Sequence, residues 1–69
     1  MEIKWVDGSK IRVKTDKDVT IIQANMEGLL SLAVQLEELA KGNKGDHIHY
    51  DEYNSLEEGS NELIIEKDD

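Results

Sequence analysis

Polar and apolar residues alternate in two short stretches near the start of the chain and predict a pair of β-strands. Residues 2–6 place Ile3 and Trp5 on one face, and residues 10–14 place Ile11 and Val13 on one face with lysine and arginine on the other. A period of two with one charged face is typical of an antiparallel strand. Asp7-Gly8 predicts the hairpin turn between them, because glycine accepts the positive φ of such a turn.

The stretch 19–22 (VTII) allows two interpretations. Its β-branched residues favour a third strand. Thr20 and Gln23, however, have the spacing of a capping box that opens a helix. We favour the strand, because Asn25 is the better N-cap, directly before a clear helical pattern.

Apolar residues then recur at spacings of three and four from residue 26 to about residue 41 and predict an amphipathic helix. Gly28 lies near its start, where close contact with a strand would explain a residue that weakens helices. Gly42 and Asn43 predict a left-handed stop. The predicted buried stripe is Met26, Leu29, Leu30, Ala33, Leu36, Leu39 and Ala40, widened by Leu32, and the predicted polar side is Glu27, Gln35, Glu38 and Lys41.

The stretch 46–52 (DHIHYDE) predicts a strand with His47, His49 and Asp51 on one face and Ile48 and Tyr50 on the other. A turn-rich acidic loop anchored by Leu56 follows, and residues 62–66 predict a last strand with apolar residues on both faces. One of those faces could meet a second copy of the chain in a homodimer. The order is β-β-β-α-β-β, a single α+β domain over residues 1–69 with one helix on a small, mostly antiparallel sheet.

Composition and charge narrow the possible functions. The chain has 69 residues, no cysteine and a net charge of −8, and residues 46–69 hold nine acidic residues against one lysine. Such a segment repels nucleic acid and anionic lipid and attracts a basic partner. No apolar run is long enough to cross a bilayer, and no signal-peptide pattern opens the chain, so we expect a soluble cytoplasmic protein without nucleic-acid or membrane partners.

Two histidines on one face of a strand raise the question of a metal site. They could share a zinc ion, with Asp51 or Glu52 as a third ligand. Two histidines without a distant third ligand are a minimal set, however, and an exposed polar row or a contact surface explains them better. Histidines that only cap the loop are a further alternative. We favour the contact surface and predict no cofactor; a small metal-binding or self-associating structural domain is the alternative function.

Catalysis is the least expected function. The serines lack the pattern of a nucleophile elbow, and the paired carboxylates would need a pocket that separates their pKa values. Tyr53 stands among carboxylates, where an exposed aromatic residue would anchor a protein interface. The alternative is that Tyr53 packs beneath its own loop with Leu56.

Four segments together resemble the immunity protein 32 family of bacterial polymorphic toxin systems: NMEGL at 25–29, GDHIHYD at 45–51, LEEGS at 56–60 and ELII at 62–65. The resemblance spans most of residues 19–66. It implies a small α+β protein that neutralises a cognate protein toxin by binding it, and it supplies no catalytic residue. An acidic face over residues 46–62 suits an inhibitor of a basic toxin. The predicted partner-binding residues are His47, His49, Asp51, Glu52, Tyr53, Glu57 and Glu58.

Overall fold

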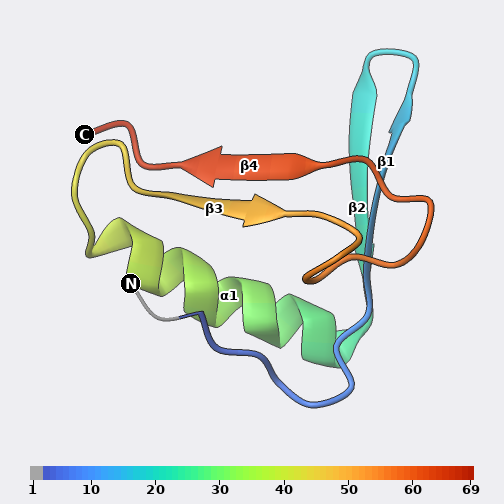
Figure 1. The fold of residues 1–69 in the computed structure, drawn as a ribbon, viewed down its shortest axis with the longest axis horizontal. Helices are drawn as coiled ribbons and strands as arrows, with labels where there is room; N and C mark the ends of the chain where they lie inside the picture. The colour runs from blue at the N-terminus through green and yellow to red at the C-terminus, as the bar shows by residue number, and fades with distance from the viewer. Residues whose placement is uncertain (1–2) are drawn as a thin grey trace.

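Four strands and one helix follow one another in the order β-β-α-β-β in a computed structural model that describes residues 3–69 (Figure 1). The strands β1 (Ile11–Asp16) and β2 (Val19–Ala24) precede the helix α1 (Met26–Ala40), and β3 (His47–Tyr50) and β4 (Leu63–Glu66) follow it. The strands form two separate antiparallel pairs, β1 with β2 and β3 with β4. The α+β class is therefore confirmed, and the predicted five-strand order is wrong.

The β1–β2 hairpin stands at the end of α1 where the helix begins, and β3 and β4 run along the length of the helix (Figure 1). In the hairpin Ile11 pairs with Ala24 and Asp16 with Val19, so the ambiguous stretch 19–22 is a strand. Lys17 makes the turn with a φ of 58°. The strand expected over 10–14 thus pairs with the chain that follows it, and not with residues 2–6.

Residues 3–6 form no strand, although they alternate like one. The Val6 N–H donates to Ser31 Oγ at 2.8 Å, and Gln35 Nε2 donates to the Lys4 carbonyl oxygen at 2.8 Å. The segment therefore lies against α1, whose side chains satisfy its backbone groups in place of a neighbouring strand. The predicted turn is present at Gly8, with a φ of 87°, but the predicted hairpin is wrong; Glu2 lies outside the described residues.

The helix begins where it was predicted, and Asn25 is its N-cap, accepting a hydrogen bond from the Gly28 N–H at 2.8 Å. Its orientation differs from the prediction. The buried residues of α1 are Gly28, Ser31, Leu32, Gln35 and Leu39, whereas Met26, Leu29, Leu30, Ala33, Leu36 and Ala40 are exposed.

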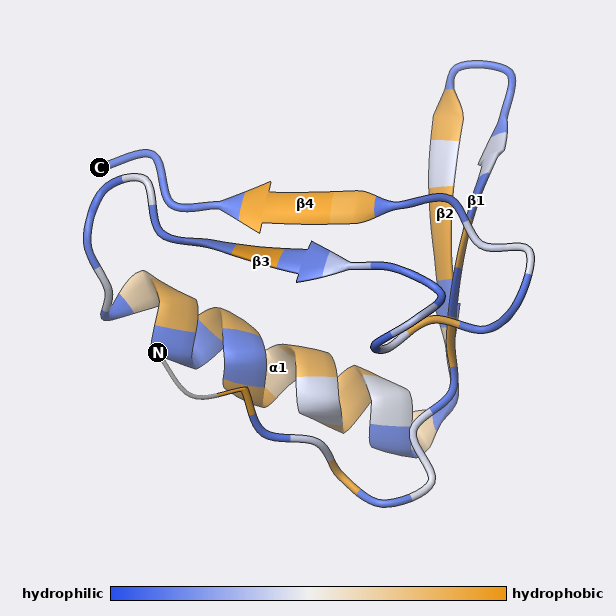
Figure 2. Ribbon diagram, viewed as in Figure 1, coloured by the Kyte–Doolittle hydropathy of each residue, from blue (hydrophilic) through white to orange (hydrophobic). Residues whose placement is uncertain are grey.

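Gly28 explains this orientation. A Cβ atom there would lie 2.8 Å from the Lys10 carbonyl oxygen and 3.1 Å from the Ala24 Cβ, so only glycine lets α1 approach the hairpin so closely. The close contact suggested for this residue is confirmed. Because Gly28 faces the hairpin, Ser31 and Gln35 turn inward with it, and the apolar stripe turns outward. Apolar and polar residues alternate along the ribbon of α1, whereas β4 is mostly apolar (Figure 2).

The end of the helix also differs from the prediction. Positive φ angles among the glycines occur at Gly8, Gly45 and Gly59, and not at Gly42, so there is no left-handed stop at Gly42 and Asn43. Asp46 Oδ2 accepts the Asn43 N–H at 2.8 Å, and a Cβ on Gly42 would lie 2.5 Å from that oxygen. The glycine therefore makes room for the carboxylate that caps the turn.

The core joins both strand pairs to the helix and consists of Ile11, Val13, Leu32, Leu39, Ile48, Tyr50 and Leu56, with Ala24, Leu63 and Ile65 packed against it. Inside it the Tyr50 hydroxyl donates to Gln35 Oε1 at 2.7 Å, and Trp5 packs edge-on against the Tyr50 ring at 6.3 Å. Burial raises the pKa of Tyr50. Over the described residues, no helix has the length and apolar character needed to span a membrane.

Candidate functional site

Strand β3 separates its four side chains as the alternation predicted. Ile48 and Tyr50 are buried in the core, and His47 and His49 are exposed on the opposite face. Each imidazole has one polar neighbour: His47 Nδ1 lies 3.4 Å from the Gly45 carbonyl oxygen, and His49 Nε2 lies 3.0 Å from Glu62 Oε2. Both partners of the second pair are well exposed, so this hydrogen bond contributes little to stability.

Asp51 does not continue the histidine row, because β3 ends at Tyr50. Its Oδ1 accepts the N–H groups of Tyr53 at 2.9 Å and Asn54 at 3.0 Å. Its carbonyl oxygen accepts the Leu56 N–H at 2.8 Å. This arrangement is an Asx turn, and it makes Asp51 the residue that shapes the start of the loop.

The loop from Asp51 to Asn61 is tied to the rest of the chain at several points. Glu52 Oε2 accepts the Gly59 N–H at 2.6 Å across the loop, and Leu56 is buried in the core. The Glu57 and Asn61 N–H groups donate to the Ile11 and Val13 carbonyl oxygens, both at 2.8 Å. The loop therefore occupies the edge of β1 that β2 leaves free, and its conformation is set before any partner binds.

Tyr53 projects from this loop with 96% of its surface exposed. The interpretation that Tyr53 packs beneath the loop is therefore wrong, since Leu56 alone fills that position. Glu52, Tyr53 and Glu58 line a surface hollow of about 400 Å³. The structure thus brings three of the predicted partner-binding residues together around the exposed ring.

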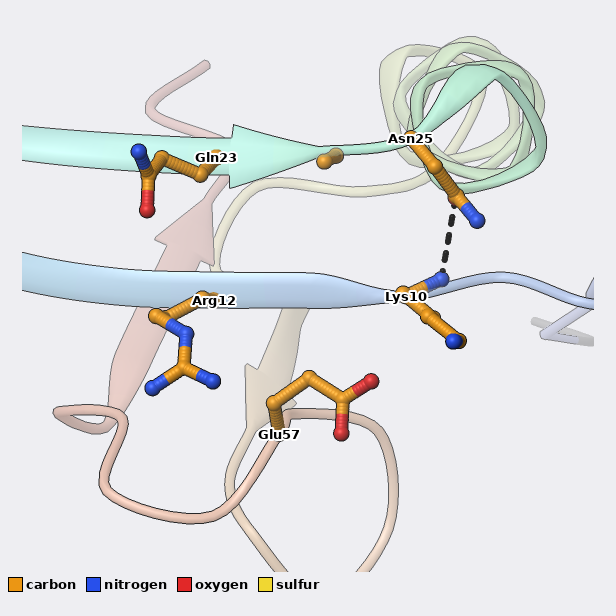
Figure 3. Close-up of a pocket in the computed structure, with 6 residues that line it drawn as sticks. Lys10, Arg12, Gln23, Asn25 and Glu57 are labelled. Carbon is orange, nitrogen blue, oxygen red and sulfur yellow. Dashed lines mark hydrogen bonds between the residues drawn. The ribbon is translucent and has the colours of Figure 1, made fainter.

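Glu57 lies apart from that hollow. It lines a second one, of about 460 Å³, together with residues of the hairpin (Figure 3): Lys10, Arg12, Gln23, Ala24 and Asn25. Arg12 Nη1 also donates to the Glu58 carbonyl oxygen at 3.3 Å. Sequence reasoning placed Lys10 and Arg12 on an outer strand face but missed their closeness to the acidic loop, because no local signal shows that the loop pairs with β1.

The described residues contain no group of three or more histidine, aspartate or glutamate side chains placed to hold a metal ion. The candidate ligands His47, His49 and Asp51 are not such a group, and the Asp51 carboxylate accepts backbone N–H groups of the loop. Glu62, which sequence reasoning did not select, is the acidic residue that reaches His49. The register of β3 with β4, which pairs Tyr50 with Leu63, brings it there.

Comparison with known proteins gives one match. The model of a protein family described as immunity protein 32 matches residues 19–68, which include β2, α1, β3, β4 and the whole of the loop that carries Tyr53. No curated protein and no solved structure shows significant similarity to the chain.

Proposed function

The chain belongs to the immunity protein 32 family, and from this premise we propose that it neutralises a cognate bacterial toxin by binding it. The contact would be made by β3 and the loop that follows it. We call this region the acidic surface; its members are His47, His49, Asp51, Glu52, Tyr53, Glu57 and Glu58. Inhibition of this kind needs only that the chain binds the toxin and blocks its functional surface, so no chemical step is assigned to the chain.

The observation that carries the proposal is the exposed ring of Tyr53 on a loop fixed by hydrogen bonds. Tyrosine supplies a large contact area with few rotatable bonds and is enriched among the residues that dominate binding energy. Hydrogen bonds to Asp51 and Glu52 hold the backbone on either side of the loop. Binding therefore costs little further loop ordering, which is the expense that weakens flexible contact surfaces.

The charge of the acidic surface suits a basic partner. Residues 46–69 hold nine acidic residues and one lysine, and Glu52 and Glu58 flank the Tyr53 ring. A concentrated negative field accelerates the encounter with a positively charged protein and loses this effect as salt is added. Glu58 is exposed, and among residues 3–69 its carboxylate accepts no hydrogen bond; its backbone carbonyl oxygen accepts from Arg12 Nη1. Its charge can therefore be reversed without removing a hydrogen bond from the loop.

The test uses the cognate toxin domain and measures binding kinetics at low and moderate salt. Glu58→Lys should slow association several-fold at low salt, with the difference shrinking as salt rises. Tyr53→Ala should mainly speed dissociation and raise Kd by tenfold or more, as loss of a central anchor does.

Asp68→Lys is the matched control, because it makes the same charge change near the exposed C-terminal end and away from the loop. It should alter association less than Glu58→Lys does. If Glu58→Lys and Asp68→Lys slow association equally, the effect comes from the net charge of the chain and not from the loop. If Tyr53→Ala leaves the rate of dissociation from the toxin unchanged, the acidic surface is not the contact.

A further inference from the structure

The outward side of α1 carries large apolar side chains that no other part of residues 3–69 covers. We call it the outer helix face; it consists of Met26, Leu29, Leu30, Ala33, Val34, Leu36, Glu37 and Ala40, and the exposed fractions of its large apolar members run from 37% at Val34 to 67% at Met26. One residue on it, Glu37, is charged. A helix on the surface of a globular protein is usually polar on its outer side, and a helix apolar on both sides is usually buried on both.

We propose that a second copy of the chain covers the outer helix face, so that two α1 helices pack against each other in a homodimer. Five large apolar side chains exposed by about half expose a few hundred Å², the size at which apolar patches mark an interaction site. Two such faces with their rims bury about 1,000 Å² in total, the lower limit for a specific protein interface.

Charge favours a second copy over a strongly charged partner at this position. The chain carries a net charge of −8, so two copies repel each other wherever their acidic regions meet. The outer helix face carries Glu37 as its one charged residue, so it offers little charge for a basic protein to recognise. Two acidic chains repel each other less across this face than where the acidic residues of 46–69 face each other.

The position of the face also separates it from the proposed toxin contact. Ile48 and Tyr50 pack into the core on the side of β3 that meets α1, whereas His47 and His49 point away from it. A partner seated on the histidines therefore leaves the outer helix face uncovered. The two surfaces can be occupied at the same time.

The pattern of side-chain sizes along the face suits antiparallel pairing about a twofold axis. Ala33 is the midpoint of the face, and its small side chain lets two helices approach closely. Around it, Met26 of one helix meets Ala40 of the other, Leu30 meets Leu36, and Leu29 meets Glu37. Met26 thus lies against a smaller side chain and Leu30 against an equal one, and Glu37 is the one charged residue in the pairing. Antiparallel alignment also opposes the two helix dipoles favourably, and the same patch serves both chains, as a twofold dimer requires.

The first test measures mass by light scattering over a series of protein concentrations. The protein should give twice the chain mass of 7.8 kDa, and Leu30→Glu should give the single chain mass with an unchanged circular dichroism spectrum. Ile64→Glu is the control, because Ile64 is exposed to a similar degree, 57% against 50%, on β4. A single chain mass for the unaltered protein at every concentration overturns the proposal. Dissociation by Ile64→Glu but not by Leu30→Glu overturns it as well and moves the contact to β4.

The second test uses the absence of cysteine from the sequence. Ala33→Cys places one thiol next to the twofold axis and should give a covalent dimer under mild oxidation. Met26→Cys places the two thiols at opposite ends of the helix pair, about 20 Å apart, too far for a disulfide. Cross-linking at position 26 and not at 33 would refute antiparallel pairing.

These experiments test the homodimer and the toxin contact independently, so one proposal can be refuted while the other stands. Leu30→Glu should keep its affinity for the toxin while losing the dimer, and Tyr53→Ala should do the opposite. If the unaltered protein instead has the single chain mass at every concentration and Leu30→Glu abolishes toxin binding, the outer helix face is the toxin contact and the homodimer is refuted.

Discussion

The Tyr50 hydroxyl donates a hydrogen bond to Gln35 Oε1 at 2.7 Å inside the core, and Tyr50→Phe removes the donor while keeping the ring. Both residues are 1% exposed, so water cannot replace the lost partner. The Gln35 oxygen is then buried without a hydrogen bond, which costs about 1–3 kcal/mol. A domain of this size rarely has more than about 3–5 kcal/mol of stability from its core, so the loss should be easily visible.

A second substitution separates this hydrogen bond from general packing. Gln35→Met in the Tyr50→Phe background removes the orphaned oxygen together with the hydroxyl, and replacing both partners by apolar groups is far less costly than removing one. Gln35 also donates to the Lys4 carbonyl oxygen, so Gln35→Met alone is destabilising. The double variant should therefore be more stable than the sum of the single effects by about 1 kcal/mol or more.

The same hydroxyl gives stability a dependence on alkaline pH. Burial raises the pKa of Tyr50 above its ordinary value near 10. Below pH 10 the tyrosine keeps its proton in both states, and its contribution to stability is complete. As the pH rises from 10 towards the raised folded pKa, the unfolded chain releases the proton and the folded chain does not, so stability falls. Tyr50→Phe should lose this part of the alkaline decline.

Urea denaturation followed by the circular dichroism of α1, at pH 7 and at several values above pH 10, measures both effects. Tyr53→Phe is the control, because Tyr53 is 96% exposed and makes no side-chain hydrogen bond among the described residues. Tyr53→Phe should match the unaltered chain at pH 7 and at each value above pH 10. The reasoning is refuted if Tyr50→Phe is as stable as Tyr53→Phe at pH 7, or if its alkaline decline is undiminished.

Three further substitutions test the packing of α1 and the exposed ion pair. Gly28→Ala gains about 1 kcal/mol of helix propensity but meets the Lys10 carbonyl oxygen at 2.8 Å, and overpacking of about 1–3 kcal/mol should lower the thermal midpoint overall; a raised midpoint would show that the hairpin yields. Asn25→Ala should cost about 1–2 kcal/mol, because its Oδ1 accepts both the Gly28 and the Lys10 N–H groups, and a change below 0.5 kcal/mol in urea titration argues against this dual role. Glu62→Gln should leave the free energy of unfolding at pH 7 within about 0.5 kcal/mol of the unaltered chain, because its partner His49 is exposed; a larger loss contradicts that view.

The parts of the fold that were predictable depend on signals that lie close together in the sequence. Asn25 directly before a helical pattern identified the start of α1, and period-two alternation identified the buried face of β3. Both depend on the backbone geometry of a few consecutive residues. The family could be identified for the same reason, since its motifs are short segments that follow one another in order.

The parts that were not predictable depend on contacts between distant residues. Residues 3–6 alternate like a strand, yet their partners are the side chains of Ser31 and Gln35, more than twenty residues away. Serine and glutamine are polar residue types usually found at the surface. Ser31 and Gln35 are buried here because each has its hydrogen-bonding groups satisfied. Composition cannot show in advance which polar residues will find such partners.

The candidate site was predictable as a region and less so in its internal roles. The acidic loop and the exposed histidines could be named from sequence. Asp51 shapes the loop through local hydrogen bonds from the Tyr53 and Asn54 N–H groups. That Glu57 faces the hairpin bases follows from pairing between the loop and β1, to which Ile11 and Val13 contribute carbonyl oxygens. Long-range pairing of an irregular segment leaves no periodic pattern to detect.

The orientation of α1 joins the failed prediction to the proposed dimer. The rule that a helix buries its apolar stripe selected Met26, Leu29 and Leu30, and a single chain leaves all three exposed. The inner face is instead built from small and hydrogen-bonding residues around Gly28, which allow close contact with the hairpin. Large apolar side chains on the opposite face then lack a partner within the chain. If two copies pair through this face, the apolar stripe of α1 is buried in the dimer although it is exposed in a single chain. The helix is then buried on both sides, as its composition indicates. Leu30→Glu decides between the two accounts, because it should abolish association if the stripe is an interface and leave the mass unchanged if the stripe is simply exposed.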